Sequence, residues 1–390
     1  MIPVNESIAG RDLAQARLNS KVAAFEARTV KTLDSYQGDI ENLKDYIVPL
    51  GEGGTVTYNA NGHVQVIDKG LLPGSMIYNK IKEQGGDPDG HAWTLHPHAS
   101  TQLGERLGIP GAFLRDMVDG EEWQRKAAAD LLEAHTQNTK RDRFLFRAVN
   151  DELRGVLSDS YKRIDSLKIL REIWENAKAA GAVPVNATYS DTRFYAEFIN
   201  PRVVEIPTSN NGTRYQAFGL RVQNSDFGDG ALDVRFLMIE AICYNGAVVE
   251  SAFRQIHLGG KLPDNLQFSE DTYRLDSATT ASQIKDITRN LLSTEKIREE
   301  IMRVQQASDT VIDMAGELKK LTKNVLGKGE VETITELLSN SRAEDGLTGA
   351  GTRFKLSQAV GTLANLDTVT PVRARELQEI AGAILGKVSE

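Results

Sequence analysis

Basic side chains gather in one stretch of the chain, between residues 140 and 171. The residues in it that could contact phosphates are Lys140, Arg141, Arg143, Arg147, Arg154, Lys162, Arg163, Lys168 and Arg171. Lysine and arginine neutralise phosphates, so such a strip can track the backbone of a nucleic acid strand. Acidic residues stand among them, at positions 142, 151, 152, 159 and 165. A solvated surface of mixed charge is therefore the alternative interpretation.

Aromatic residues near this stretch could add flat surfaces on which bases stack. The candidates are Tyr161, Phe194 and Tyr195, because an aromatic face accepts any base without reading its sequence. Ser158 and Tyr161 place polar groups between apolar neighbours. We therefore add Ser158 to the predicted nucleic-acid-binding residues.

Histidines cluster in the segment His91-Ala-Trp-Thr-Leu-His96-Pro-His98. Two imidazoles could share a metal ion if the segment were extended and a carboxylate joined them. His98 instead stands at the predicted entry to a helix, where a histidine can simply be exposed. The sequence does not decide whether His91, His96 and His98 bind a metal, and we predict no metal site and no cofactor.

Other catalytic patterns are weak or missing. Two carboxylate pairs, Asp191 with Glu197 and Asp226 with Asp229, have a spacing that turn and edge residues share. Cys243 ends an apolar run and is interpreted as a small buried residue. The chain has no phosphate-loop motif, no H-E-x-x-H, no paired C-x-x-C and no G-x-S-x-G. We predict no catalytic residue.

Composition indicates an ordinary soluble protein rather than a nucleic-acid coat protein. The chain has 390 residues, 40% of them hydrophobic, and a net charge of −8. An acidic chain can still bind DNA through a local basic strip. No apolar run approaches the roughly 20 residues that span a bilayer, and the start resembles no signal peptide. With one cysteine, these features predict no membrane association and a reducing, cytoplasmic location.

The elements that must position these residues fall into successive parts of the chain. Apolar residues at helical spacing predict a helical N-terminal extension over 1–50, with a helix from about 10 to 48. The segment 51–141 should hold a hairpin at 55–58 and 64–67 and helices at about 97–107 and 110–118. Residues 142–262 should form an antiparallel α+β core, with a hairpin at 144–157, a helix ending near Gly181 and six further strands.

Residues 276–390 are predicted to be a helical C-terminal region. Asp276 or Ser277 should cap a long helix that begins near Thr279. Between residues 297 and 325, apolar residues recur at steps of four and three, so this helix could pack within the chain or against another subunit. The predicted class is α+β, a largely antiparallel sheet with packed helices.

Several motifs in order resemble a known family. The segment Ala99–Pro110, with Gln102, Leu103, Leu107 and the final Gly-Ile-Pro, resembles the A-x-x-Q-L…L-G-I-P element of the phage/plasmid-like proteins called domain of unknown function 932. Further matching segments are Arg154–Asp165, Gly219–Gly228, Cys243–Gly246 and Thr352–Ala359, where Gln358 stands in place of an expected Asn. The resemblance covers roughly 55–365 and implies a mobile-element protein in a bacterial cytoplasm, without a list of catalytic residues.

These observations leave several functions open. The leading hypothesis is a DNA-handling protein that binds or anneals single-stranded DNA as a homo-oligomer, by a fold-level analogy with ring-forming strand-annealing proteins. The alternative is a non-enzymatic protein that binds a host defence protein or nuclease, for which acidic charge is suited. The third is a nuclease-like enzyme whose site is assembled from scattered carboxylates.

Overall fold

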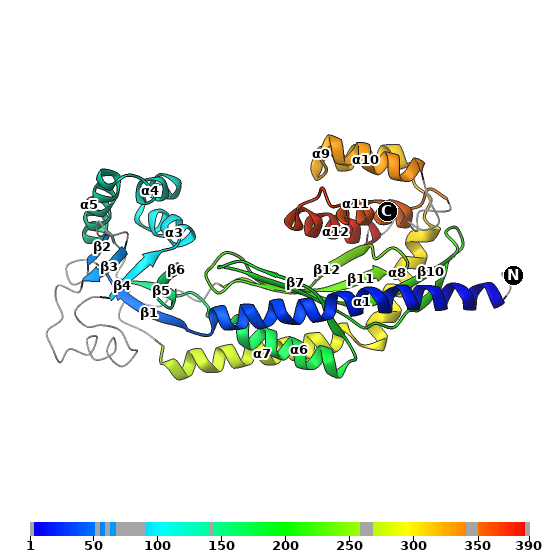
Figure 1. Cartoon of the computed structure of the whole chain (residues 1–390), viewed down its shortest axis with the longest axis horizontal. Helices are drawn as coiled ribbons and strands as arrows, with labels where there is room; N and C mark the ends of the chain where they lie inside the picture. The colour runs from blue at the N-terminus through cyan, green and yellow to red at the C-terminus, as the bar shows by residue number, and fades with distance from the viewer. Residues whose placement is uncertain are drawn as a thin grey trace.

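The computed structural model describes residues 4–50, 55–58, 63–67, 91–140, 143–257, 268–340 and 350–386. Its helices and two mostly antiparallel sheets confirm the predicted α+β class. The molecule is elongated, and the sheets follow one another along its long axis (Figure 1). We call the unit around the first sheet the head and the unit around the second sheet the body.

The head sheet is assembled from segments that are far apart in the sequence. Its strand order is β1 (Leu43–Pro49), β5 (Arg143–Val149), β6 (Glu152–Ser158), β4 (His91–Leu95), β3 (His63–Ile67) and β2 (Thr55–Tyr58). Strands β4 and β6 are parallel and the other neighbours are antiparallel. Helices α3 (Pro97–Leu107), α4 (Gly111–Val118) and α5 (Glu122–Asn138) pack with it around one apolar core.

The body sheet is antiparallel throughout. Its order is β12 (Gly246–Gln255), β11 (Leu232–Glu240), β10 (Thr213–Asn224), β8 (Phe194–Ile199) and β7 (Val183–Tyr189), with β9 (Val204–Pro207) paired to β10. Alternate residues of a strand point to opposite faces. Phe218, Leu220 and Val222 therefore meet α6 (Ser166–Ala179) and α7 (Glu270–Leu291) in the largest core cluster. Ala217 lies in a separate cluster with Leu18 of α1.

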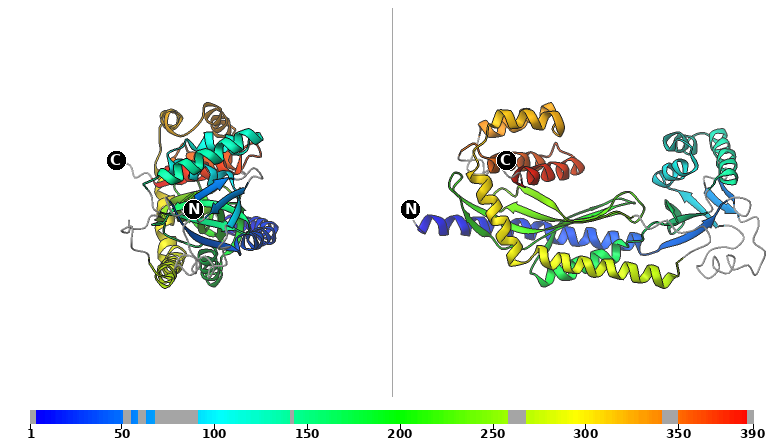
Figure 2. Two further views of the ribbon diagram at one scale, coloured as in Figure 1. Left: turned by 90° about the vertical axis from the view of Figure 1, so that its left-hand side faces the viewer. Right: turned by 180° about the vertical axis from the view of Figure 1, so that it is seen from behind.

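Helices cover both faces of the body sheet. Helix α1 (Val4–Ile40) runs along the edge strand β7 and ends at the head, while α6 and α7 lie beneath the body sheet in the view of Figure 1. The remaining helices are α8 (Thr294–Asp309), α9 (Met314–Asn324), α10 (Lys328–Ser339), α11 (Arg353–Ala364) and α12 (Pro371–Gly386). Both views in Figure 2 show α11 and α12 stacked against the sheet, with α9 and α10 outside them.

Several predicted elements need correction. The N-terminal helix ends at Ile40 rather than near 48, because residues 43–49 pair with β5 and satisfy their backbone groups in the sheet. The long C-terminal helix is divided: Ser269, not Asp276 or Ser277, caps α7, and Ser293 starts a new helix by accepting a hydrogen bond from the Lys296 backbone at 3.2 Å. Helix α5 had no predicted counterpart. The six further strands predicted in this part of the chain correspond to β7 to β12.

The predicted division of the chain at residue 142 differs from the observed arrangement. Strands β5 and β6 belong to the head sheet, where β5 pairs with β1 and β6 with β4. The chain leaves the head only after Ser158 and enters the body at Ser166, the first residue of α6. Pairing between distant segments thus decides the boundary. The predicted turn at 59–62 lies outside the described residues.

Candidate functional site

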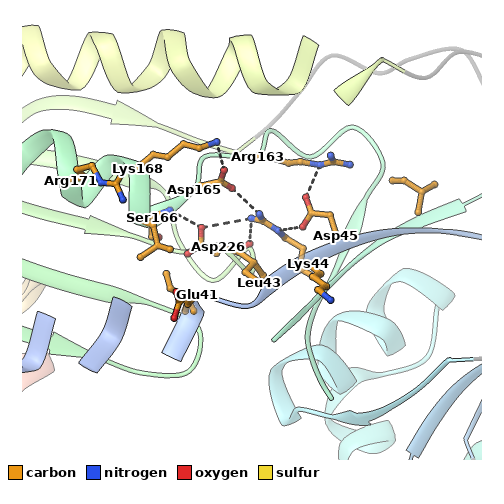
Figure 3. A pocket seen from close by; sticks show the side chains of 14 residues that line it. Glu41, Leu43, Lys44, Asp45, Arg163, Asp165, Ser166, Lys168, Arg171 and Asp226 are labelled. Carbon is orange, nitrogen blue, oxygen red and sulfur yellow. Dashed lines mark hydrogen bonds and ion pairs between the residues drawn. The ribbon is translucent and has the colours of Figure 1, made fainter. Parts of the chain in front are cut away.

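A cavity of about 640 Å³ lies where the head meets the body. Its walls come from the end of α1, from β1 and β5, from the segment 159–165, from the start of α6 and from the turn between β10 and β11. Figure 3 shows the charged side chains that line it. Four stretches of the chain meet here, namely residues 40–47, Arg147, residues 163–171 and Asp226, so the cavity exists only in the complete fold.

Arg147 is the centre of the cavity floor. Its side chain is only 2% exposed. Its Nε lies 2.8 Å from Asp45 Oδ1, its Nη2 3.0 Å from Asp165 Oδ1, and its Nη1 donates to the Asp226 carbonyl at 2.7 Å. Burial opposes the charge, but the carboxylates of these residues outweigh it and hold the pKa of Arg147 well above its usual value. Arg147 is therefore a fixed cation that joins head and body.

The carboxylates around Arg147 differ in their environments. Burial raises the pKa of Asp226, although Arg147 opposes this and Asp165 adds to it. Asp226 Oδ1 also accepts a hydrogen bond from the Ser166 backbone at 2.9 Å, so it caps α6 from a distant part of the chain. Burial also works against ionised Asp165, but Arg147 and Lys168 lower its pKa overall. Asp165 stands at the N-cap position of α6, but its side chain makes no cap hydrogen bond.

A second arginine extends the network toward α7. Arg163 Nε lies 3.1 Å from Asp45 Oδ2, so the Asp45 carboxylate bridges Arg147 and Arg163. The Arg163 guanidinium stands 4.1 Å from the centre of the Tyr273 ring, a cation–π distance. The bridge connects β1, β5, the segment 159–165 and α7.

The cavity rim carries exposed charges of both signs. Lys44 of β1 and Lys168 and Arg171 of α6 are exposed cations, and Glu41 is an exposed anion beside them. Lys168 pairs with Asp165 at 2.9 Å. Among the residues that the structure describes, neither Lys44 nor Arg171 has an ion-pair partner. We call Lys44, Lys168 and Arg171 the cationic rim.

The predicted phosphate-binding residues occupy different positions from those expected. Arg147, Arg154 and Arg163 are buried, and this burial removes them from a surface groove. Arg154 pairs with Asp39 and Glu152, each at 2.7 Å.

The other predicted cations also have acidic partners or stand alone. Arg143 lies 2.8 Å from Asp159, and Lys162 lies 3.1 Å from Asp276. Lys140 is exposed, and Arg141 lies outside the described residues. Three of the interspersed acidic residues, Glu152, Asp159 and Asp165, thus serve as partners of the basic ones.

The predicted stacking residues are also interior. Tyr161 stacks on His257 with ring centres 5.0 Å apart and donates to the Ser225 carbonyl at 3.2 Å. Phe194 and Tyr195 are 1% and 2% exposed. Ser158 lies 3.2 Å from the hydroxyl of Ser160. These side chains do not form an open stacking surface.

The histidine segment has a structural explanation. His96 Nδ1 accepts a hydrogen bond from the His98 backbone at the start of α3, and its Nε2 lies 3.4 Å from Asp191. His98 Nε2 lies 3.0 Å from the Phe227 carbonyl oxygen. The His91 side chain lies outside the described residues. Within the described ranges, no group of three or more His, Cys, Asp or Glu side chains is placed to hold a metal ion.

The proposed carboxylate pairs do not meet as pairs. Glu197 lies 2.7 Å from Arg221, and Asp229 lies 3.0 Å from Arg193. Burial and the nearby Glu240 raise the pKa of Cys243 to about 12, so its thiol stays protonated at neutral pH.

Motif residues of the family resemblance hold the β10–β11 turn against the head. Gln102 donates to the Phe227 carbonyl at 2.8 Å and accepts from the Val156 backbone at 2.8 Å. Ser225 Oγ accepts from the backbones of Phe227 and Asp229. Phe227 is 1% exposed. These polar residues are explained by the junction of head and body.

The sequence singled out part of this site. Lys168 and Arg171 belong to the basic stretch, but Lys44 and Asp45 lie about a hundred residues earlier, and no local signal connects them to it. Asp226 was considered only as a partner of Asp229. Pairing of β1 with β5 brings Asp45 opposite Arg147.

Comparison with known proteins adds no relative: no protein-family model, curated protein or solved structure matches the chain. The resemblance to domain of unknown function 932 therefore stays a prediction. None of the helices in the described parts of the chain has the length and apolar character to cross a membrane.

Proposed function

We propose that the protein is a non-catalytic DNA-handling protein of a mobile element, which binds single-stranded DNA as a homo-oligomer. The observation that supports this is the cationic rim. Lys44, Lys168 and Arg171 come from two distant elements and surround one cavity, whose floor carries buried Arg147. Phosphates contribute most of the affinity in sequence-independent binding, and exposed lysines and arginines are their usual partners.

The buried arginines have a positioning role in this proposal. Arg147 holds Asp45 of β1, and Asp45 is the neighbour of Lys44 in the sequence. The same guanidinium contacts Asp165, which precedes α6 and its cations. Arg147 thereby keeps both sides of the rim at a constant separation. Because Tyr161, Phe194 and Tyr195 are buried, the strand would be held through its phosphates, with little preference for sequence.

The test is to reverse the rim charges together, in the variant Lys44→Glu, Lys168→Glu, Arg171→Glu. Binding of a labelled single-stranded oligonucleotide is followed by fluorescence anisotropy over a range of salt concentrations. Loss of three phosphate contacts should weaken binding strongly and reduce the slope of log K against log salt by about 2.

A matched control carries the same charge change on α9 and α10, in the variant Lys319→Glu, Lys323→Glu, Lys328→Glu, whose lysines are all exposed. Both variants change the net charge equally. Equal binding by the two variants would show that the rim does not hold the strand, and absence of salt-dependent binding by the unaltered protein would reject the function.

The alternative function, binding to a host protein, has one specific observation in its favour. Trp123 and Phe113, on neighbouring helices of the head, are 64% and 49% exposed, and exposed aromatics often become central contacts in protein interfaces. If the protein ignores DNA, its affinity for a purified host nuclease with and without Trp123→Ala is the next measurement.

A further inference from the structure

Tyr195 is enclosed by arginines on the face of the body sheet that looks away from α6 and α7. The Arg375 guanidinium of α12 stands 4.5 Å from the centre of the Tyr195 ring, and that of Arg221 on β10 stands 5.1 Å from it. The neighbouring residue Phe194 points to the other face, into the core with α6. This cluster is thus separate from the cavity between head and body, whose lining does not include it.

Most cations of this face have carboxylate partners. Arg221 lies 2.7 Å from Glu197, and Arg193 lies 3.0 Å from Asp229. A third arginine, Arg235, is held by Asp233 at 2.7 Å and by Glu379 at 3.0 Å. Arg221 and Arg235 are therefore neutralised by residues of the same chain, whereas Arg193 stays partly exposed beside its partner.

Arg375 differs from its neighbours. Its Nη1 donates to the Thr188 hydroxyl at 3.1 Å, and it forms no ion pair with a residue that the structure describes. Burial lowers the pKa of Arg375, and the positive charges of Arg221 and Arg193 lower it further, although Tyr195 and Glu197 act in the opposite direction. A half-buried guanidinium without a counter-ion is an unfavourable arrangement, and an anion bound to it would remove the imbalance.

We propose that Arg375, together with Arg193, binds a phosphate group on this face of the body sheet. The planar guanidinium offers paired N–H donors that match two phosphate oxygens. Thr188 and the Tyr195 ring hold the Arg375 fork in place through the contacts described above. Arg193 has 43% of its side chain exposed in spite of its pair with Asp229, and its positive charge acts on Arg375, so it supplies the second cation. The phosphate can be free in solution or part of a nucleic acid strand, since the same donors serve both.

Calorimetric titration of the full chain with inorganic phosphate, against a chloride buffer of equal ionic strength, tests this site. The unaltered protein should show saturable binding. Arg375→Ala should weaken it by about tenfold or more, because a charge-assisted hydrogen bond pair is lost. Arg375→Lys should recover only part of the affinity, since an ammonium lacks the paired donors. Thermal unfolding of each variant establishes that it is folded.

The matched control is Arg298→Ala, which removes an exposed arginine from α8 without an ion-pair partner among the described residues. It should leave phosphate binding unchanged. The proposal is overturned if the unaltered protein shows no saturable phosphate binding, or if Arg375→Ala and Arg298→Ala bind phosphate equally well.

Two further experiments identify the source of the phosphate and test whether the site is independent of the cationic rim. If a single-stranded oligonucleotide displaces inorganic phosphate, the natural ligand is a strand; if it does not, the ligand is a free phosphate, and either result agrees with the site. The rim variant Lys44→Glu, Lys168→Glu, Arg171→Glu should still bind inorganic phosphate. If the rim variant loses phosphate binding and Arg375→Ala keeps it, the anion binds at the cavity and the proposed site at Arg375 is rejected. This conclusion does not depend on whether the protein binds DNA.

Discussion

Buried histidine His257 shows how a single residue couples the body sheet to the segment that leads out of the head. Its Nδ1 lies 3.1 Å from the Lys162 carbonyl and its Nε2 2.9 Å from Asn224 Oδ1. Asn224 Nδ2 donates to Ile164 and Ser166, so its oxygen faces the imidazole. A neutral imidazole has one N–H and can donate to only one of these oxygens. Burial nevertheless lowers the pKa of His257 to about 4, with Arg147 also acting against protonation.

The depressed pKa predicts a loss of stability in mild acid. The folded protein binds fewer protons than the unfolded chain between pH 6.5 and about pH 4. The contribution of His257 is therefore complete above pH 6.5 and disappears as pH falls toward 4, amounting to about 2 kcal/mol between pH 7.5 and pH 5. Urea unfolding at both pH values, for the unaltered protein and for His257→Gln, measures it.

Comparison of the two proteins isolates His257, because every other titrating group is common to both. Glutamine keeps a donor for the Lys162 carbonyl but does not titrate in this range. The unaltered protein should lose more stability on acidification than the variant. An identical pH dependence in both would mean that His257 has an ordinary pKa in the folded state.

At the scale of elements, the turn between β10 and β11 joins the body to the head. Gly228 in this turn has φ = 76°, and an added Cβ would lie 2.6 Å from Leu157 Cδ2 and 3.1 Å from Gln102 Nε2. Its neighbour Phe227 is enclosed between β6 and α3: a Cβ on Gly155 of β6 would come within 3.3 Å of it. The turn thus requires both a left-handed backbone and space for a close approach.

Gly228→Ala should therefore lower the free energy of unfolding by more than the strain of a left-handed backbone at alanine would by itself. The control Gly212→Ala has a similar φ of 67° but open space around the added Cβ. We expect a cost of about 1 kcal/mol for Gly212→Ala and at least about twice that for Gly228→Ala, measured by chemical unfolding. If both cost the same, the contacts of the turn with the head contribute little.

At the scale of the whole molecule, apolar side chains are exposed between helices α8 and α9 and just after α9. Val311 and Val325 are 66% and 45% exposed, although they belong to the predicted helical seam. Other seam residues, such as Val304 and Leu318, are buried within the chain. The seam thus packs mainly inside the molecule, and its exposed remainder is the candidate contact between subunits.

Light scattering should give a mass that is a multiple of the 42.9 kDa chain. Val311→Asp should lower that mass, because a charge in an apolar contact between subunits is strongly unfavourable. Leu275→Asp, at a 58% exposed position on α7, is the control and should leave the mass unchanged. A monomeric mass for the unaltered protein would reject the homo-oligomer.

The sequence by itself determined the α+β class, the body strands and most of the helices. Periodicity and turn residues are local, so β10 and the hairpin at Asn150, with φ = 52°, could be predicted from adjacent residues. The burial of the basic residues between 140 and 171 could not be predicted, because the pattern of charges in a sequence does not show which carboxylates will pair with them.

Only the tertiary structure decided the site. Asp45 and Arg147 are separated by 102 positions, and they meet because β1, predicted as the end of a helix, pairs with β5. The competing helix has local hydrogen bonds, but the strand gains sheet pairing and burial of Tyr46 and Val48. Because distant segments pair in this way, Arg147 is buried, whereas Lys44, Lys168 and Arg171 of the cationic rim stay exposed.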